Sequence, residues 1–174
     1  VKAGADVVVL DGMQGGTAAT QEVFIENVGQ PTLACIRPAV DALQDLNMHR
    51  QVQLIISGGI RNGADVAKAM ALGADAVSIG SAAMIAIGDN DPKWNKEYKK
   101  LGSEAGAYDD WHEGKDPAGI TTQDTKLMKR LDPKKAGKRL SNYLKVMTLE
   151  AQTLARACGK NDLHNLEPED LCAL

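Results

Sequence analysis

Three short apolar runs, each followed by glycine and then by a helical pattern, dominate the first half of the chain. The runs span residues 5–10, 52–57 and 76–79 and contain mainly valine, isoleucine, leucine and alanine. Short runs that are apolar on both faces are typical of buried strands in a parallel sheet. Residues 63–72 carry apolar side chains at helical spacing, and Gly73 marks the helix end. Repeated strand–turn–helix units predict the α/β fold class.

Weaker patterns fill the segments between these units. Residues 82–87 are small and apolar and predict a helix after the third strand. A further helix is expected from about residue 38 to residue 46, whereas residues 21–29 fit either a helix or a surface loop. The stretch 32–36, which lies between two prolines, favours no one structure.

The second half of the chain changes character twice. Residues 89–132 are polar, contain both tryptophans and carry three Asp-Pro pairs, which predicts a long irregular insertion with room for a helix at 92–101. Residues 133–158 return to helical periodicity, and we expect the apolar face of this helix to pack in the core. That face consists of Leu140, Tyr143, Leu144, Met147, Ala151, Leu154, Ala155 and Cys158. Gly159 ends the helix, and Pro168 lies in the first turn of a short one.

Composition narrows the classes of function. The chain has 174 residues, 44% of them hydrophobic and 3% aromatic, and a net charge of −3. This charge favours no nucleic-acid partner, and no apolar run approaches the roughly 20 residues that span a bilayer. Cys35, Cys158 and Cys172 are odd in number and widely spaced, so we expect reduced, buried thiols in a cytoplasmic protein. Because the chain opens on a turn into a strand, we expect it to be part of a larger domain.

Two glycine turns are candidates for binding a phosphate group. Ser57-Gly58-Gly59 follows the second strand, and Gly80-Ser81 follows the third. Glycine lets backbone N–H groups approach an anion without a Cβ in the way, and a helix N-terminus adds the positive end of its dipole. We therefore predict that both turns contact one phosphate. The alternative is that they are only tight connections between strands and helices.

The loop after the first strand, residues 11–20, is also rich in glycine. It lacks the Gly-Lys-Ser/Thr ending of a P-loop. Because a buried strand precedes it, we predict that this loop lies over a bound ring or substrate.

Two further side chains admit both a functional and a structural interpretation. Arg61 either reaches the phosphate or pairs with Asp65, four residues later on the same helix. His112 lies among acidic residues that could ligate a metal, but such a segment is more often a polar surface loop. No metal site is predicted.

These motifs resemble the synthase domain of glutamate synthase, a family of FMN-dependent TIM barrels. Residues 57–80 are similar to the phosphate-binding block that several such families share. The segment LDGMQGGTAAT is similar to the Gly-x-x-Gly-Gly-Thr-Gly-Ala loop of glutamate synthase, with Ala18 in place of its last glycine. A hydroxy-acid oxidase would instead place a catalytic His and a nearby Arg in this region. Residues 80–88 and 116–123 resemble the family's GTAALIALG and CPVGVATQ segments.

The resemblance implies the C-terminal portion of a TIM (β/α)8 barrel with a long insertion and a C-terminal helical extension. Residues 1–88 would be the last βα units of the FMN-binding barrel, 89–132 the insertion and 133–174 the extension. FMN is the implied cofactor, and its binding residues would be Ser57, Gly58, Gly59, Gly80, Ser81 and Gln14. The substrate would lie near Gly15, Gly16 and Thr17. The family's essential lysine would precede Val1, so no catalytic residue is assigned within the chain.

The resemblance ends where the family holds a 3Fe–4S cluster on three cysteines. The first of these corresponds to Asp89 and the last to Asp116, and residues 89–123 contain no cysteine. Because thiolates are the usual ligands of such clusters, none is expected here. The insertion instead resembles stand-alone glutamate synthase-like proteins, such as the large subunit of N-methylglutamate synthase.

The implied function is an FMN-dependent oxidoreductase of amino-acid nitrogen metabolism. It would either reductively aminate 2-oxoglutarate through an imine or form N-methylglutamate from an amine and glutamate. Ammonia, methylamine and glutamine-derived nitrogen all stay open as the amine. The expected partners are other subunits or the remaining barrel half, in an oligomer, with neither nucleic acid nor membrane; the chain by itself is expected to be inactive. Two alternatives remain: a phosphate-binding barrel without flavin, and a fragment with a purely structural role.

Overall fold

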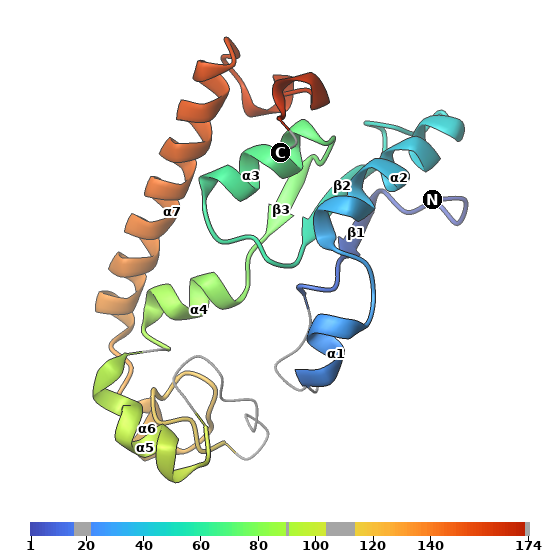
Figure 1. The fold of residues 1–174 in the computed structure, drawn as a ribbon. Helices are drawn as coiled ribbons and strands as arrows, with labels where there is room; N and C mark the ends of the chain where they lie inside the picture. Colours follow the sequence, from blue (N-terminus) through green and yellow to red (C-terminus); the bar gives the residue numbers. More distant parts are fainter. Residues whose placement is uncertain (16–21, 90, 104–113, 173–174) are drawn as a thin grey trace. The chain divides into compact units, whose positions relative to one another are not determined.

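The computed structural model describes residues 1–15, 22–89, 91–103 and 114–172 of the chain (Figure 1). The chain divides into two compact units. The first contains residues 1–16, 22–79 and 146–174, and the second contains residues 17–21 and 80–145. No helix in the described ranges is both long enough and apolar enough to cross a membrane.

A parallel sheet of three strands is the centre of the first unit. Its strands are β1 (Val7–Asp11), β2 (Gln53–Ser57) and β3 (Ala76–Ser78), in the order β1-β2-β3. The register pairs Asp11 with Ser57 and Ser57 with Ser78, so the carboxyl ends of the three strands meet at one edge. The predicted α/β class with a parallel sheet is therefore confirmed, whereas the closed barrel stays a prediction.

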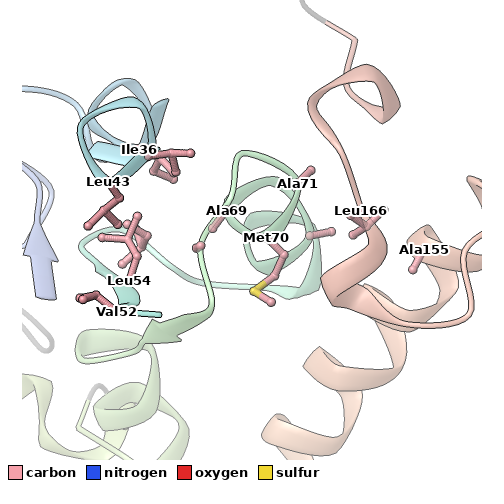
Figure 2. Packing of buried hydrophobic residues seen from close by; sticks show 13 residues of the cluster. Ile36, Leu43, Val52, Leu54, Ala69, Met70, Ala71, Ala155 and Leu166 are labelled. Atoms are coloured by element: carbon pink, nitrogen blue, oxygen red, sulfur yellow. The ribbon is translucent and has the colours of Figure 1, made fainter. Parts of the chain in front are cut away.

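One face of this sheet packs against α2 (Thr32–Asp45) and α3 (Gly63–Ala71), and Figure 2 shows the side chains that meet there. Leu54 and Ile56 of β2 are at most 1% exposed and belong to one buried cluster with Ile36 of α2. Residues two apart on a strand point to the same face, so the alternating burial of β2 follows from the pleat. The core is thus built by branched aliphatic side chains, as the low aromatic content requires.

The opposite face of the sheet is open among the described residues. Val7 and Val9 of β1 are 47% and 58% exposed, although both are apolar. The prediction that this first strand is buried on both faces is therefore wrong for this chain. The reason is that the described helices of the first unit cover one side of the sheet, the side that Val8 and Leu10 share with the core cluster.

Two helices between β1 and β2 resolve the ambiguous segments. α1 spans Glu22–Asn27, and α2 begins at Thr32, well before Pro38. Pro38 lies inside α2, where its ring removes one backbone hydrogen bond. The helix nevertheless continues through it, because Thr32, Ile36 and Val40 recur every four residues and are all buried. Tertiary packing thus extends the helix further than the sequence pattern predicted.

The long predicted helix is confirmed as α7 (Pro133–Ala157), but only part of its apolar face is buried. Met147 and Ala151 are buried, whereas Leu144 and Leu154 are 40% and 38% exposed. The prediction that the whole face packs in the core is therefore wrong. The buried part is the strip that faces α3 in the first unit.

α3 and α7 approach each other closely at one glycine. A Cβ on Gly63 would clash with the carbonyl oxygen of Met147 and the backbone nitrogen of Ala151. The Gly63 N–H donates a hydrogen bond of 2.7 Å to the carboxylate of Glu150. Glu150 thereby places a negative charge at the positive end of the α3 dipole, which is a favourable arrangement.

The cysteines are free, as expected, but they are not buried. Cys35 is partly exposed, and Cys158 and Cys172 are exposed. The prediction of buried thiols is wrong because Cys158 lies just beyond the end of α7 and Cys172 lies in the tail. That tail contains two 3-10 turns, η3 (Leu163–Asn165) and η4 (Pro168–Asp170), the second of which confirms the short helix predicted at Pro168.

The second unit is more ordered than the prediction of an irregular insertion suggested. It contains α4 (Ser81–Ile87), η1 (Pro92–Trp94), α5 (Asn95–Lys100), α6 (Thr125–Met128) and the first part of α7. The helix considered at 92–101 is confirmed by η1 and α5, which are the first two helical elements of the insertion. Tyr98 is fully buried and Asp116 is 1% exposed, so the unit has a polar centre of its own.

Candidate functional site

A cavity of about 230 Å³ opens at the carboxyl ends of β1 and β2 in the first unit. It is lined by Gln14, Pro31, Thr32, Leu33, Gly58, Gly59, Ile60, Arg61 and Asp65. Three of the residues proposed from the sequence, Gln14, Gly58 and Gly59, are therefore brought together. Ligands of parallel α/β proteins bind at this end of the strands, because the loops and helix N-termini converge there.

Gly58 and Gly59 cannot be replaced by larger residues without moving the wall of this cavity. Both have a left-handed backbone, with φ of +109° and +74°. A Cβ on Gly58 would lie 2.7 Å from the backbone nitrogen of Gly15 and from the Thr32 hydroxyl, and one on Gly59 would lie 2.9 Å from the Cβ of Gln14. The loop after β1 thus folds directly over the turn after β2.

The turn also offers hydrogen-bond donors to a ligand. Within the described part of the chain, the backbone N–H groups of Gly58 and Gly59 donate to no protein acceptor. Successive N–H groups in a turn with positive φ form a concave site that suits an anion. The residues present therefore fit the phosphate group of the expected FMN.

Gln14 has a structural role that the sequence did not reveal. Its side-chain oxygen accepts hydrogen bonds from the Thr32 backbone N–H at 2.8 Å and from the Thr32 hydroxyl at 2.9 Å. Gln14 therefore caps the N-terminus of α2, where backbone N–H groups lack partners within the helix. Thr32 itself was missed, because its segment carried no preference in the sequence; a threonine at a helix start was the only available signal.

Arg61 lies just before α3 and has a partner, Asp65, in the first turn of that helix. Its Nε lies 3.3 Å from Asp65 Oδ2, and its backbone N–H donates to the same oxygen at 3.1 Å. The structural interpretation of Arg61 is therefore confirmed. The Arg61 side chain is nevertheless 75% exposed and lines the cavity, so it adds positive potential beside the glycine turn.

Ser57 lies with two other polar residues at the carboxyl edge of the open sheet face. Asp11, Ser57 and Ser78 are register neighbours on β1, β2 and β3, so their side chains share one face. Gly15 lies against this group, because a Cβ on Gly15 would clash with the Asp11 carboxylate. Asp11 and Ser78 were not selected from the sequence; the register shows that they flank Ser57.

The remaining predicted residues are not tested by this geometry. Gly16 and Thr17 lie outside the described residues, as does His112 with its acidic neighbours. Gly80 and Ser81 belong to the second unit, where Gly80 is the N-cap of α4. Whether they contact the same phosphate as Gly58 and Gly59 stays a prediction.

The second unit contains Asp89 and Asp116, which the resemblance aligns with two of the cluster cysteines. Asp116 accepts four hydrogen bonds: from the Tyr98 hydroxyl at 2.9 Å, and from the backbone N–H groups of Ala118, Ile120 and Thr121 at 2.9, 2.8 and 2.9 Å. The Tyr98 hydroxyl also lies 3.0 Å from the carbonyl oxygen of Asp89. An Asp-Pro-x-Gly sequence is a turn signal, and it was the only hint of this network.

The pKa values of the two acids in this network are shifted in opposite directions. Burial alone would raise the pKa of Asp116, but the hydrogen bonds that it accepts hold that pKa below its usual value. The pKa of Asp89 is raised, first by its burial and then by the negative charge of Asp116. Burial and the hydrogen bond to Asp116 hold the pKa of the Tyr98 phenol far above its ordinary value.

This donor set does not fit an iron–sulfur cluster. The carboxylate of Asp116 is fully used by internal hydrogen bonds, and no thiol occurs in residues 89–123. Hard carboxylate oxygens are poor replacements for the thiolates that hold such clusters.

Comparison with known proteins extends over almost the entire chain. Residues 1–92 and 107–161 match the model of the conserved region in glutamate synthase. A glutamate synthase large subunit-like protein of Rhizobium meliloti is 84% identical over 174 residues, which are all of this chain and 39% of that protein. An archaeal-type glutamate synthase [NADPH] of Dehalococcoides mccartyi is 39% identical over 95% of this chain and 30% of its own length.

A glutamate synthase large subunit-like protein of Bacillus subtilis is 30% identical over 90% of the chain and 27% of its own length. The chain thus spans less than two-fifths of the length of these relatives. The match covers the segments that carry the glycine turns after β1, β2 and β3. The chain therefore belongs to the glutamate synthase family.

Proposed function

We propose that this chain supplies the phosphate-binding part of the FMN site in a glutamate synthase-type oxidoreductase. The observation that carries the proposal is the cavity at the ends of β1 and β2, with its two positive-φ glycines and their available N–H groups. Family membership supports the same assignment, since the matched region includes these turns. It does not favour a barrel without flavin or a purely structural role.

In this proposal, each residue of the site has its own role in binding FMN or the substrate. Gly58 and Gly59 donate backbone N–H bonds to the phosphate, and Ser57 adds a hydroxyl at the strand end. Arg61 raises the positive potential at the mouth of the cavity. Gln14 keeps α2 and the loop after β1 in contact, which positions Gly15 for the substrate. FMN, when bound, supplies hydride transfer for the reduction of the substrate's C=N bond.

Gly80 and Ser81 complete the phosphate site in this proposal. They follow β3 just as Gly58 and Gly59 follow β2, and β2 and β3 are neighbours in the sheet. Thr17 and Gly16 would continue the substrate-binding loop that begins at Gly15. The catalytic lysine is assigned to another part of the whole protein.

The second unit supports a proposal about the cluster. We propose that the whole protein belongs to the subgroup without a 3Fe–4S cluster, because the Tyr98–Asp116 network takes the place of its ligands. The product would be glutamate from 2-oxoglutarate, or N-methylglutamate from glutamate and methylamine with release of the amino group of glutamate as ammonia. The large subunit-like name of the Rhizobium relative is consistent with further subunits that deliver electrons or nitrogen in a cytoplasmic complex.

The test uses two glycines with nearly the same backbone strain. Gly59→Ala fills the cradle, since its Cβ would lie 2.9 Å from Gln14, whereas Gly159→Ala at φ +75° meets nothing within 4 Å. Both are made in the full-length protein, and FMN content is measured from the visible flavin absorbance of the purified protein. We expect Gly59→Ala to lose most of its FMN and Gly159→Ala to retain it, with both proteins folded by circular dichroism.

Equal FMN content in the two variants, or a colourless wild-type protein that does not take up added FMN, would refute the flavin assignment. Iron and acid-labile sulfide are measured in the same preparations, and stoichiometric amounts of both would refute the absence of a cluster. Product analysis with ammonia, methylamine or glutamine as the amine then distinguishes glutamate from N-methylglutamate formation.

A further inference from the structure

A second cavity, of about 200 Å³, lies entirely within the second unit. Its lining includes four basic side chains, from Lys93, Arg130, Lys135 and Arg139, and two acidic ones, from Asp91 and Asp132. This lining carries two more positive than negative charges, although the chain as a whole has a net charge of −3. A concentration of positive charge in a concave site attracts anions.

One wall of this cavity is held in place by the network around Asp116. Arg130 Nη1 donates to the carbonyl oxygen of Pro117 at 2.8 Å and lies 2.9 Å from Glu97 Oε2. The Arg130 guanidinium also stacks over the ring of Trp94, 4.5 Å from its centroid. These contacts hold the indole and the guanidinium in place, and the carboxylate of Glu97 offsets the charge of Arg130.

The lining also includes two basic residues from α7. Lys135 and Arg139 lie one turn apart on α7, and neither forms an ion pair with any described residue. Arg139 lies over the backbone at the end of α4, because a Cβ on Gly88 would be 3.2 Å from its Nη1. Neighbouring residues i and i+4 of a helix face the same side, so both cations can reach one ligand.

The two acidic residues of the lining also contact other groups. Asp91 pairs with the ammonium group of Lys93 at 3.0 Å. Asp132 accepts hydrogen bonds from the backbone N–H groups of Lys134 and Lys135 at 3.0 and 3.2 Å and so caps α7. The hydrogen bonds from Lys93 lower the pKa of Asp91, and the nearby charge of Arg139 lowers it further, so Asp91 offsets part of the charge of Arg139. The lining still carries two more basic than acidic residues.

We propose that this cavity binds a small dianionic oxyanion, held by the ammonium group of Lys135 and the guanidinium of Arg139. A guanidinium binds two oxygens of a carboxylate or phosphate side by side, and the lysine adds a point charge. The cavity volume of about 200 Å³ has room for an ion of this size. Inorganic phosphate and a short dicarboxylate are the two sources of this chemistry.

The test is isothermal titration calorimetry of the full-length protein with inorganic phosphate and, separately, with glutarate, at constant ionic strength. Lys135→Gln/Arg139→Gln removes both proposed ligands. Lys134→Gln/Lys138→Gln is a matched control, since it removes the same charge at the same spacing on the same helix without touching the cavity lining. The ligand with the tighter wild-type binding identifies the source.

We expect saturable binding by the wild-type protein and by the control variant, and at least a tenfold rise of Kd in Lys135→Gln/Arg139→Gln. Arg139→Lys should recover part of the affinity, because it keeps the charge but loses the planar fork. No saturable binding of either ion, or an equal loss in both double variants, would overturn the proposal. Circular dichroism of each variant excludes unfolding as the cause.

Discussion

Replacement of Asp116 by asparagine tests whether the buried carboxylate organises the second unit. Each carboxylate oxygen accepts two hydrogen bonds: Oδ1 from Tyr98 and Ala118, and Oδ2 from Ile120 and Thr121. Asparagine keeps one oxygen and replaces the other with an NH₂ group, which cannot accept. If the NH₂ group replaces Oδ2, the N–H groups of Ile120 and Thr121 lose their acceptor. If it replaces Oδ1, the Ala118 N–H loses its acceptor, whereas the Tyr98 hydroxyl can still donate to the carbonyl oxygen of Asp89. At least one hydrogen bond to the charged carboxylate is lost in either orientation.

The magnitude follows from this count. A hydrogen bond to a charged group contributes about 1.5–3 kcal/mol, so the substitution costs about 1.5 kcal/mol or more of local stability. Because every 1.4 kcal/mol is tenfold in an equilibrium constant, local opening should become at least about tenfold more frequent. The assay is hydrogen exchange of the full-length protein, read by mass spectrometry on peptides from residues 91–103 and 114–131, because local opening need not follow global unfolding.

The matched control is Asp124→Asn. Asp124 caps α6 with a single oxygen, Oδ1, which accepts from the backbone N–H groups of Lys126 and Leu127. Asparagine retains that oxygen and is about as good an N-cap as aspartate, so the expected change is below about 0.5 kcal/mol. If Asp116→Asn accelerates exchange less than fivefold, or no more than Asp124→Asn does, the reasoning that this carboxylate holds the unit together is refuted.

Three further predictions address the rest of the chain. Asp89→Asn should raise the melting temperature at pH 7, because the raised pKa of Asp89 in the folded state means that the ionised carboxylate destabilises the fold. In acid, Asp89 is neutral and the variant should have no advantage. An unchanged melting temperature at pH 7 would contradict this prediction. Gly63→Ala should destabilise the protein by about 1–3 kcal/mol, because the added Cβ meets the backbone of α7. Gly137→Ala, whose Cβ meets nothing within 4 Å, should stabilise it by up to about 1 kcal/mol. If urea unfolding gives both changes the same sign, the close contact between α3 and α7 is refuted. Gln14→Ala should lower the free energy of unfolding by about 1 kcal/mol, because Thr32 loses the hydrogen bonds that Gln14 accepts. Hydrogen exchange at the start of α2 should become faster, and an unchanged rate there would show that the cap is unimportant.

The sequence by itself determined the strands, most of the helices and the family, because each depends on local patterns. Apolar runs, helical spacing and the glycines after β1, β2 and β3 are properties of a few neighbouring residues, and they selected Gly58, Gly59 and Gln14, which the structure brings to one cavity. The limits of α2 were missed because burial of Ile36 and Val40 outweighs the hydrogen bond lost at Pro38.

Only the tertiary structure decided which faces are covered and which polar groups meet. Val7 and Val9 are exposed although their pattern is that of a buried strand, because burial depends on what packs over a face. The contact of Tyr98 with Asp116 joins residues 18 positions apart, and that of Gly63 with Glu150 joins residues 87 positions apart. No local pattern encodes such pairs, because they form only when folding brings distant segments to hydrogen-bonding distance.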